Sequence, residues 1–174
     1  MCDMSSLLSV IQKVQPDEIY NLAAQSHVRV SFDQPIYTLD TIARGTLNLL
    51  EAVRLCKVDT KIYQASSSEM IGNSIDVDGF QREMFATNGI LFNHESPRRG
   101  VSFVTNKIIV GAVKIKKGLE KNLILGNLDS TRDWGHAKDY VKVMWQLLQL
   151  QEPGDYVCAT GASHSVKEFC ELTF

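Results

Sequence analysis

The sequence has no long hydrophobic run and no close pair of cysteines. Its longest apolar stretches, such as residues 108–113, are far shorter than the roughly 20 residues that a membrane-spanning helix needs, so we expect no membrane segment. The four cysteines, at positions 2, 56, 158 and 170, form no C-x-x-C pair, which argues against a zinc knuckle or a dense disulfide framework. The start, Met1-Cys2-Asp3-Met4, is acidic and polar, so we expect no secretory leader and a cytoplasmic protein.

An excess of basic residues and a glycine-rich loop are also missing. The chain carries 18 Lys and Arg against 20 Asp and Glu, a net charge of −2, which disfavours nucleic acid as a partner. None of the 11 glycines stands in G-x-G or G-x-x-G spacing, so the usual phosphate loop of a dinucleotide-binding unit is not in this sequence. What remains is the composition of an ordinary globular chain of about one domain.

Apolar periodicity predicts helices that alternate with short strands. We expect a first helix between Asp3 and Pro16, a long helix from Pro35 to about Cys56, and further helices over 104–117, 136–150 and from Ser165 onward. Strands are expected at 18–24, 61–65, 87–92, 123–125 and 156–159, and a loop at 129–135. This alternation predicts an α/β fold with a parallel sheet.

The long helix is predicted to bury one apolar stripe. Residues that recur every three or four positions define that stripe. They are Leu39, Ile42, Ala43, Thr46, Leu47, Leu50 and Val53.

Three of the predicted strands end in polar segments, at 25–27, 66–69 and 93–99. Ligands of open parallel sheets bind at the carboxyl ends of the strands, so these segments would converge on one rim suited to a phosphorylated or sugar ligand. Each segment also has a structural interpretation. The serines could be turns or helix caps, Glu69 a solvated acid, and His27 and His94 hydrogen-bonded structural imidazoles. The 132–134 segment could be a salt-bridged corner with a packing aromatic ring, and the Arg98-Arg99 pair a charged surface.

Five blocks of sequence, at 21–28, 63–69, 88–100, 126–129 and 132–141, resemble the GDP-mannose 4,6-dehydratases. This family belongs to the extended short-chain dehydrogenases/reductases. The strings Asn-His-Glu-Ser-Pro-Arg-Arg-Gly at 93–100 and Arg-Asp-Trp-Gly-His-Ala-Lys-Asp-Tyr-Val at 132–141 are the most specific of the blocks.

The resemblance implies a partial Rossmann-like parallel sheet with flanking helices, without the first βαβ unit, plus part of the small C-terminal substrate region. Residues 1–100 would form the partial NADP-binding domain. Residues 101–174 would form a partial GDP-sugar-binding region interleaved with the last Rossmann strands. GDP-mannose and NADP are the implied ligands, and a homo-oligomer, or pairing with a full-length dehydratase subunit, is the implied assembly.

The family is a carbon-oxygen lyase of nucleotide-sugar metabolism, on the route to GDP-fucose and related deoxysugars. Its reaction oxidises the sugar 4-hydroxyl by hydride transfer to NADP, removes water across the neighbouring bond and returns the hydride to the sixth carbon. The product is GDP-4-keto-6-deoxymannose, and the cofactor is not consumed.

Position by position, the resemblance implies roles for single residues. Glu69 matches the base that takes the proton next to the new ketone, and Ser67 matches a hydroxyl that hydrogen-bonds the 4-oxygen. Asn93 and Arg132 match positions near the diphosphate and ribose of the substrate. The implied cofactor contacts are Leu22, Ala23, Ala24, Gln25, Ser26, Tyr37, His94 and Arg99.

The sequence departs from the family at its catalytic Tyr-x-x-x-Lys pair, since none of the five tyrosines has a lysine four residues on. Only residues 72–86 stand where the family has the long helix that carries this pair, which indicates an internal deletion. We therefore expect this chain to be catalytically incomplete on its own. The alternative is a non-catalytic fragment that binds a GDP-sugar or pairs with an intact dehydratase subunit. A gene model that omits the missing segments is a third interpretation.

Overall fold

The computed structural model describes residues 1–26, 28–67 and 84–174. This part of the chain divides into two compact units. Unit 1 consists of Met1–Ile90 and Met144–Tyr156. Unit 2 consists of Leu91–Val143 and Val157–Phe174.

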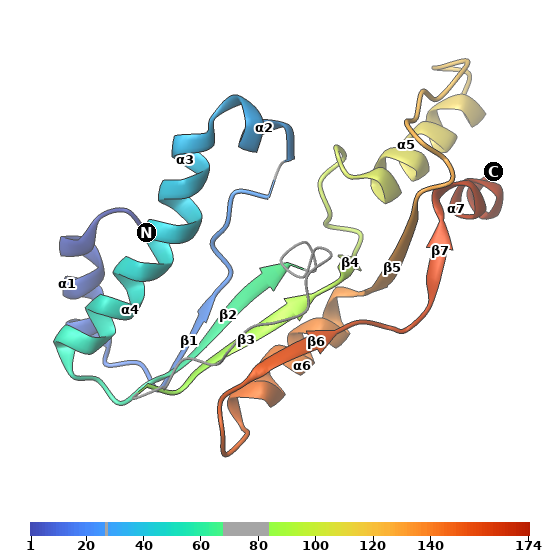
Figure 1. Ribbon diagram of the computed structural model, residues 1–174. Coiled ribbons are helices and arrows are strands. Elements are labelled where there is room, and N and C mark those ends of the chain that lie inside the picture. Colours follow the sequence, from blue (N-terminus) through green and yellow to red (C-terminus); the bar gives the residue numbers. More distant parts are fainter. Residues whose placement is uncertain (27, 68–83) are drawn as a thin grey trace. The chain divides into compact units, whose positions relative to one another are not determined.

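Most of a four-stranded sheet lies in unit 1. Its order is β1 (Glu18–Asn21), β2 (Lys61–Ser67), β3 (Ala86–Leu91) and β6 (Asp155–Cys158). The pairing of β1 with β2 is parallel, with Ile19 opposite Ile62, and the arrow of β3 points the same way (Figure 1). The strands predicted near 61–65, 87–92 and 156–159 are confirmed. The first predicted strand is shorter than expected, because it ends at Asn21. The predicted α/β class with a parallel sheet is confirmed.

Helix α1 (Met4–Val14) begins and ends where the sequence predicts. The carboxylate of Asp3 accepts hydrogen bonds from the backbone N–H groups of Ser5 and Ser6 and so caps the first turn. Gln15, in the left-handed conformation, ends the helix. The helix lies beside α4 (Gly45–Cys56) (Figure 1), and the core between these elements and the sheet is apolar. Its buried residues are Ile11, Leu49, Ala52, Val53 and Ile62.

The long helix predicted from Pro35 to Cys56 is confirmed, but it is not uniform. It comprises α3 (Pro35–Leu39), one π-helical turn η1 (Asp40–Arg44) and α4, and a short helix α2 (Val28–Asp33) precedes it. The predicted apolar stripe is right only in part: Val53 is buried and Leu50 packs against the core, but Leu39, Ile42 and Leu47 are exposed. No residue of α3 or η1 is buried, so the core-facing stripe is confined to α4, where Leu49 and Ala52 join Val53.

A second, three-stranded sheet lies in unit 2. Its order is β4 (Asn93–Glu95), β5 (Thr131–His136) and β7 (Ser163–Ser165), with β4 parallel and β7 antiparallel to β5. The sequence predicted a loop at 129–135 and a strand at 123–125, and both predictions are wrong, since 131–136 is the strand and 123–125 is not one. Segment 131–136 lacks apolar alternation, so its strand character comes from its distant partners β4 and β7.

The remaining helices are α5 (Val104–Lys116), α6 (Ala137–Leu148) and α7 (Val166–Thr173). All three were predicted. In α5, Ile108 is buried, and a Cβ on Gly111 would lie 2.7 Å from the side chain of Leu123, so glycine lets segment 119–128 pack closely. Among the described residues, no helix is both long and apolar enough to cross a membrane.

Candidate functional site

The segment after β1, residues 22–26, is fastened at its start by a buried asparagine. The Asn21 side-chain amide donates to Gln64 Oε1 at 2.6 Å, and its Oδ1 accepts from the Ala23 N–H at 3.2 Å. Further on, Gln25 Nε2 donates to Thr38 Oγ1 at 3.3 Å. Leu22, Ala23, Ala24 and Ser26 are exposed. The segment is therefore an accessible backbone run held at both ends, as expected of a strand end that lies along a ligand.

Other predicted residues of unit 1 are placed only in part. Tyr37 lies on α3 and is 54% exposed. Ser66, near the end of β2, donates its hydroxyl to Asn88 Oδ1 at 2.5 Å. Ser67 is the last residue of β2, but its side chain lies outside what the structure describes, and so do Glu69 and His27. The two predicted catalytic residues therefore stay predictions.

In unit 2, strand register gathers the predicted substrate-binding residues on one face of the β4-β5-β7 sheet. Asn93 of β4 is paired with Trp134 of β5, and Arg132 of β5 is paired with His164 of β7. Paired residues share a face, and residues two apart along a strand also share one. Asn93 and Arg132 are therefore on the same face, together with Trp134 and His164.

His94 lies on the opposite face of that sheet. Its Nδ1 is 3.0 Å from the Phe92 carbonyl oxygen, and its ring centroid is 5.0 Å from that of Tyr140. A Cβ on Gly135, the residue paired with His94, would be 2.5 Å from the Tyr140 ring. Tyr140 is buried, and burial raises the pKa of its hydroxyl. His94 thus belongs to a packed layer, which matches the structural interpretation and leaves its predicted cofactor contact untested.

Arg99 is held inside unit 2 by three partners. Its guanidinium donates to the His94 carbonyl oxygen, lies 3.4 Å from the Glu95 carboxylate and stacks 4.1 Å from the ring centroid of Phe103. Thr105 Oγ1 also donates to Glu95, at 2.6 Å. These contacts give Arg99 a structural role, because it links β4 to the start of α5. Its predicted role as a cofactor contact stays a prediction.

Asp133, which sequence reasoning did not select on its own, is the most strongly engaged carboxylate in the sheet. It is 6% exposed and accepts hydrogen bonds from Thr160 N, Thr160 Oγ1 and Gly161 N at 2.8–3.0 Å. Burial alone would raise the pKa of Asp133, but the hydrogen bonds of residues 160–162 outweigh it and hold the pKa below the ordinary value. Gly161 has a φ of +82°, which favours glycine.

The 132–134 segment is therefore a packed corner, but the expected salt bridge inside it is not what secures it. Asp133 binds the turn at 160–161, while Arg132 is exposed and donates to its neighbouring Thr131 carbonyl at 2.7 Å. Trp134 packs on Phe169 of α7, with ring centroids 5.5 Å apart. The packed Asp and Trp hold the backbone of β5, and the side chain of Arg132 extends from it.

A cavity of about 530 Å³ lies elsewhere in unit 2 and contains none of the predicted site residues. Its wall is mainly apolar and comes from α5, segment 123–128 and α7. Among the described residues, no cluster of His, Cys, Asp and Glu could hold a metal ion. The face of Asn93 and Arg132 therefore offers the better chemistry for a polar ligand, because it presents an amide and a guanidinium.

A protein-family model described as GDP-mannose 4,6 dehydratase matches residues 1–83 and 79–174 of the chain. The match covers the whole sequence in two segments that meet at 79–83.

Curated relatives from distant organisms agree with this model. The GDP-mannose 4,6-dehydratase of Vibrio cholerae is 48% identical over 202 residues, which include 98% of this chain and 54% of the relative. That of Drosophila melanogaster is 49% identical over 203 residues, with 100% of this chain and 51% of the relative. The chain thus spans about half the length of the curated relatives it matches. Both alignments are longer than the 174 residues of the chain, so the relatives have internal residues without a counterpart here.

Solved structures share the fold. RMD from Pseudomonas aeruginosa, complexed with NADPH, superposes with a TM-score of 0.86 at 24% identity and covers 98% of this chain and 68% of its own. DesIV, a dTDP-glucose 4,6-dehydratase from Streptomyces venezuelae with NAD bound, has a TM-score of 0.82 at 18% identity over 99% of this chain and 60% of its own.

Proposed function

The chain belongs to the GDP-mannose 4,6-dehydratase family, and from that premise we propose that GDP-mannose is its ligand and that it is a GDP-mannose 4,6-dehydratase-like protein. The observation that carries the proposal is the shared face of Asn93 and Arg132. These are the two positions at which the family resemblance implies contact with the GDP-sugar, and strand register puts them on the same face of neighbouring strands, diagonally opposite each other.

Asn93 and Arg132 are chemically suited to a diphosphate. An exposed guanidinium offers forked N–H donors that match phosphate oxygens, and an amide N–H adds an uncharged donor. The packed neighbours Asp133 and Trp134 fix the strand from which Arg132 extends. The guanidinium therefore starts from a rigid backbone, which lowers the entropic cost of holding the ligand.

Ser67 and Glu69 are proposed as the catalytic residues. The Glu69 carboxylate would remove the proton from the carbon beside the new ketone, because ketone formation makes that C–H bond acidic. The Ser67 hydroxyl would hydrogen-bond the 4-oxygen of the sugar. Both assignments rest on the sequence block 63–69. Its first five residues are the last five of β2, which ends at Ser67.

NADP is the proposed cofactor, which when bound would accept the hydride from the 4-hydroxyl and return it to the sixth carbon. The backbone of Leu22–Ser26 fits one edge of such a cofactor, because it is accessible, held at both ends and lined by small residues such as Ala23 and Ala24. Tyr37 adds an exposed ring on the same unit. Proteins of the same fold support a nicotinamide cofactor, since one is complexed with NADPH and another with NAD.

We further propose that the isolated chain binds its substrate without converting it. A positioned general acid or base contributes roughly 10²–10⁴ in rate, and the Tyr-x-x-x-Lys pair is missing from the sequence. Turnover would then require an intact family member as a partner subunit, which is the assembly we propose beside a homo-oligomer.

Calorimetric titration of the full 174-residue chain with GDP-mannose tests the proposal. We expect saturable binding that Arg132→Ala weakens at least about tenfold, while Arg98→Ala, a matched exposed arginine, leaves it unchanged. No binding to the folded chain would overturn the proposal. A parallel assay for the 4-keto product, with NADP supplied, tests turnover, and product formed by the chain alone would contradict the expected inactivity.

A further inference from the structure

We propose that His164 is a second residue of the nucleotide-binding face, where it accepts a hydrogen bond from a ribose hydroxyl of the GDP group while Arg132 holds the adjoining phosphate. This inference rests on the proposed function, and it adds a residue that neither the sequence blocks nor the family resemblance singled out.

The position of His164 comes from strand register. In the antiparallel pairing of β5 with β7, Arg132 lies directly opposite His164. Directly opposed residues project from the same face, with Cβ atoms about 4.5–5.5 Å apart. The Arg132 side chain is exposed and the His164 side chain is 50% exposed, so both can reach the same small ligand.

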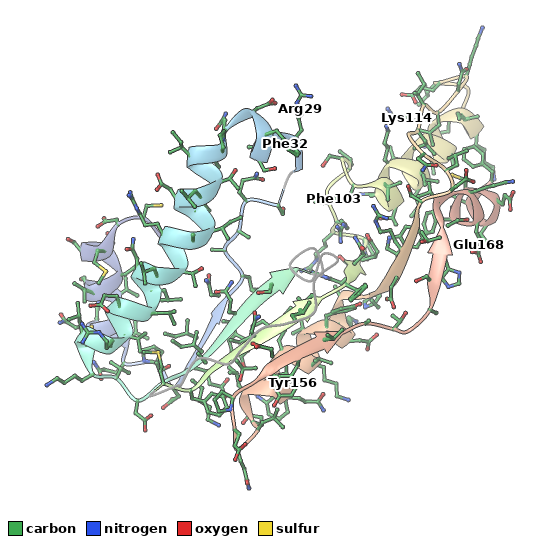
Figure 2. The ribbon with its side chains drawn as sticks, in the orientation of Figure 1. Arg29, Phe32, Phe103, Lys114, Tyr156 and Glu168 are labelled. Atoms are coloured by element: carbon green, nitrogen blue, oxygen red, sulfur yellow. The ribbon has the colours of Figure 1, made fainter. Side chains whose placement is uncertain are left out.

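Glu168 fixes the orientation of the His164 ring. Its Oε1 atom is 2.9 Å from His164 Nδ1, and Glu168 extends from the first turn of α7 beside β7 (Figure 2). A carboxylate acceptor at Nδ1 favours the tautomer in which Nδ1 carries the proton. In that tautomer Nε2, on the other side of the ring, is a hydrogen-bond acceptor.

The tautomer decides which part of a nucleotide His164 would contact. When the ring is neutral with its proton on Nδ1, Nε2 is an acceptor, so a phosphate oxygen, also an acceptor, suits Arg132 and does not suit Nε2. A ribose hydroxyl is a donor, and it lies next to the phosphate of the same nucleotide. The cross-strand pair thus presents a donor, the Arg132 guanidinium, for the phosphate and an acceptor, His164 Nε2, for the neighbouring ribose hydroxyl.

The start of α7 does not supply the anion contact instead. Its first backbone N–H groups already donate to partners: Val166 to the Ser130 carbonyl, Lys167 to the Leu128 carbonyl and Glu168 to Ser165 Oγ. The recognition chemistry on this part of the face therefore comes from side chains, and the opposed pair Arg132 and His164 carries it.

Calorimetry on the full chain with GDP, 2′-deoxy-GDP and 3′-deoxy-GDP tests the inference. We expect the unchanged chain to bind one deoxy analogue about five- to tenfold more weakly than GDP, as for the loss of one hydrogen bond. His164→Ala should weaken GDP binding by a similar factor and remove the difference between GDP and that analogue. His164→Gln, which keeps an acceptor, should recover part of the affinity.

Ser163→Ala is the matched control, because Ser163 precedes His164 on β7 and is paired with Asp133, on the other face. It should leave all three affinities unchanged. If His164→Ala binds GDP as the unchanged chain does, or keeps the full penalty for the deoxy analogue, the inference is wrong and the proposed function stands. If the folded, unchanged chain binds neither GDP nor GDP-mannose, both are overturned.

Discussion

Tyr63 crosses Gly89 so closely that a Cβ atom on residue 89 would lie 2.1 Å from the Tyr63 hydroxyl oxygen and 2.7 Å from its ring. Tyr63 is fully buried on β2, and Gly89 is buried on β3. The glycine at 89 is therefore a packing requirement, because the aromatic side chain occupies the space in which a larger residue would place its first carbon atom.

Gly89→Ala should destabilise the protein by about 1–3 kcal/mol, because the added methyl group overpacks a closed core. Denaturant unfolding measures the change. Gly126→Ala is the control, since a Cβ there would have no atom within 4 Å. Equal stability of the two variants would show that Tyr63 yields easily to the added carbon.

Tyr20 should ionise at unusually high pH. Partial burial and the hydrogen bond that its hydroxyl donates to Glu18 Oε2, 2.6 Å long, raise the pKa of Tyr20 from 10.0 to about 12. The unfolded chain ionises first, so the stability that Tyr20 contributes is complete below pH 10 and is lost as the pH rises toward 12.

Ultraviolet absorbance of tyrosinate measures this pKa, as the difference between the unchanged chain and Tyr20→Phe. Glu18→Gln should lower the pKa of Tyr20 toward its ordinary value, because it removes the negative charge next to the phenol. If Tyr20 in the folded, unchanged chain titrates near pH 10, its hydroxyl is not held by the hydrogen bond to Glu18.

Asp133→Asn should destabilise unit 2 by about 1–3 kcal/mol, because an amide cannot accept all the hydrogen bonds that the carboxylate receives from Thr160 and Gly161. The lowered pKa of Asp133 means that its contribution is present above the ordinary value of 3.8 and is lost as the pH falls through the lower folded value.

Unfolding experiments at neutral pH and at a series of values below 3.8 measure the effect. Asp129→Asn, at an exposed carboxylate nearby in the sequence, should change stability little. If both variants lose stability equally, the turn at 160–161 does not depend on Asp133.

The fold was predictable from sequence where the signal is local. The helix expected between Asp3 and Pro16 begins with a cap from Asp3, and the helix expected from Ser165 onward begins with Ser165 Oγ accepting from the Glu168 N–H. The Glu168 carboxylate itself contacts His164. Strand β5 was missed because its six residues are mostly polar, and nothing near it in the sequence indicates its partners β4 and β7.

The sequence predicted which residues belong to the candidate site, but not which of them share a face of the sheet. Family resemblance singled out Asn93 and Arg132, and strand register shows that they share a face. His164 carries no local signal, because its importance depends on pairing with a strand about 30 residues earlier in the chain, and that strand was itself predicted as a loop. Ser67 and Glu69 stay predictions.

The π turn η1 contains one more residue than an α-helical turn, so side chains of α3 and α4 do not continue along one helical stripe. The facing of α4 is set by Leu49, Ala52 and Val53 in the core, whereas the facing of α3, and with it the direction of Tyr37, is offset from it by one helical position, roughly 100°. The loss of one residue within 40–44 would therefore turn Tyr37 by about 100° relative to the core residues of α4, all of which lie beyond that segment.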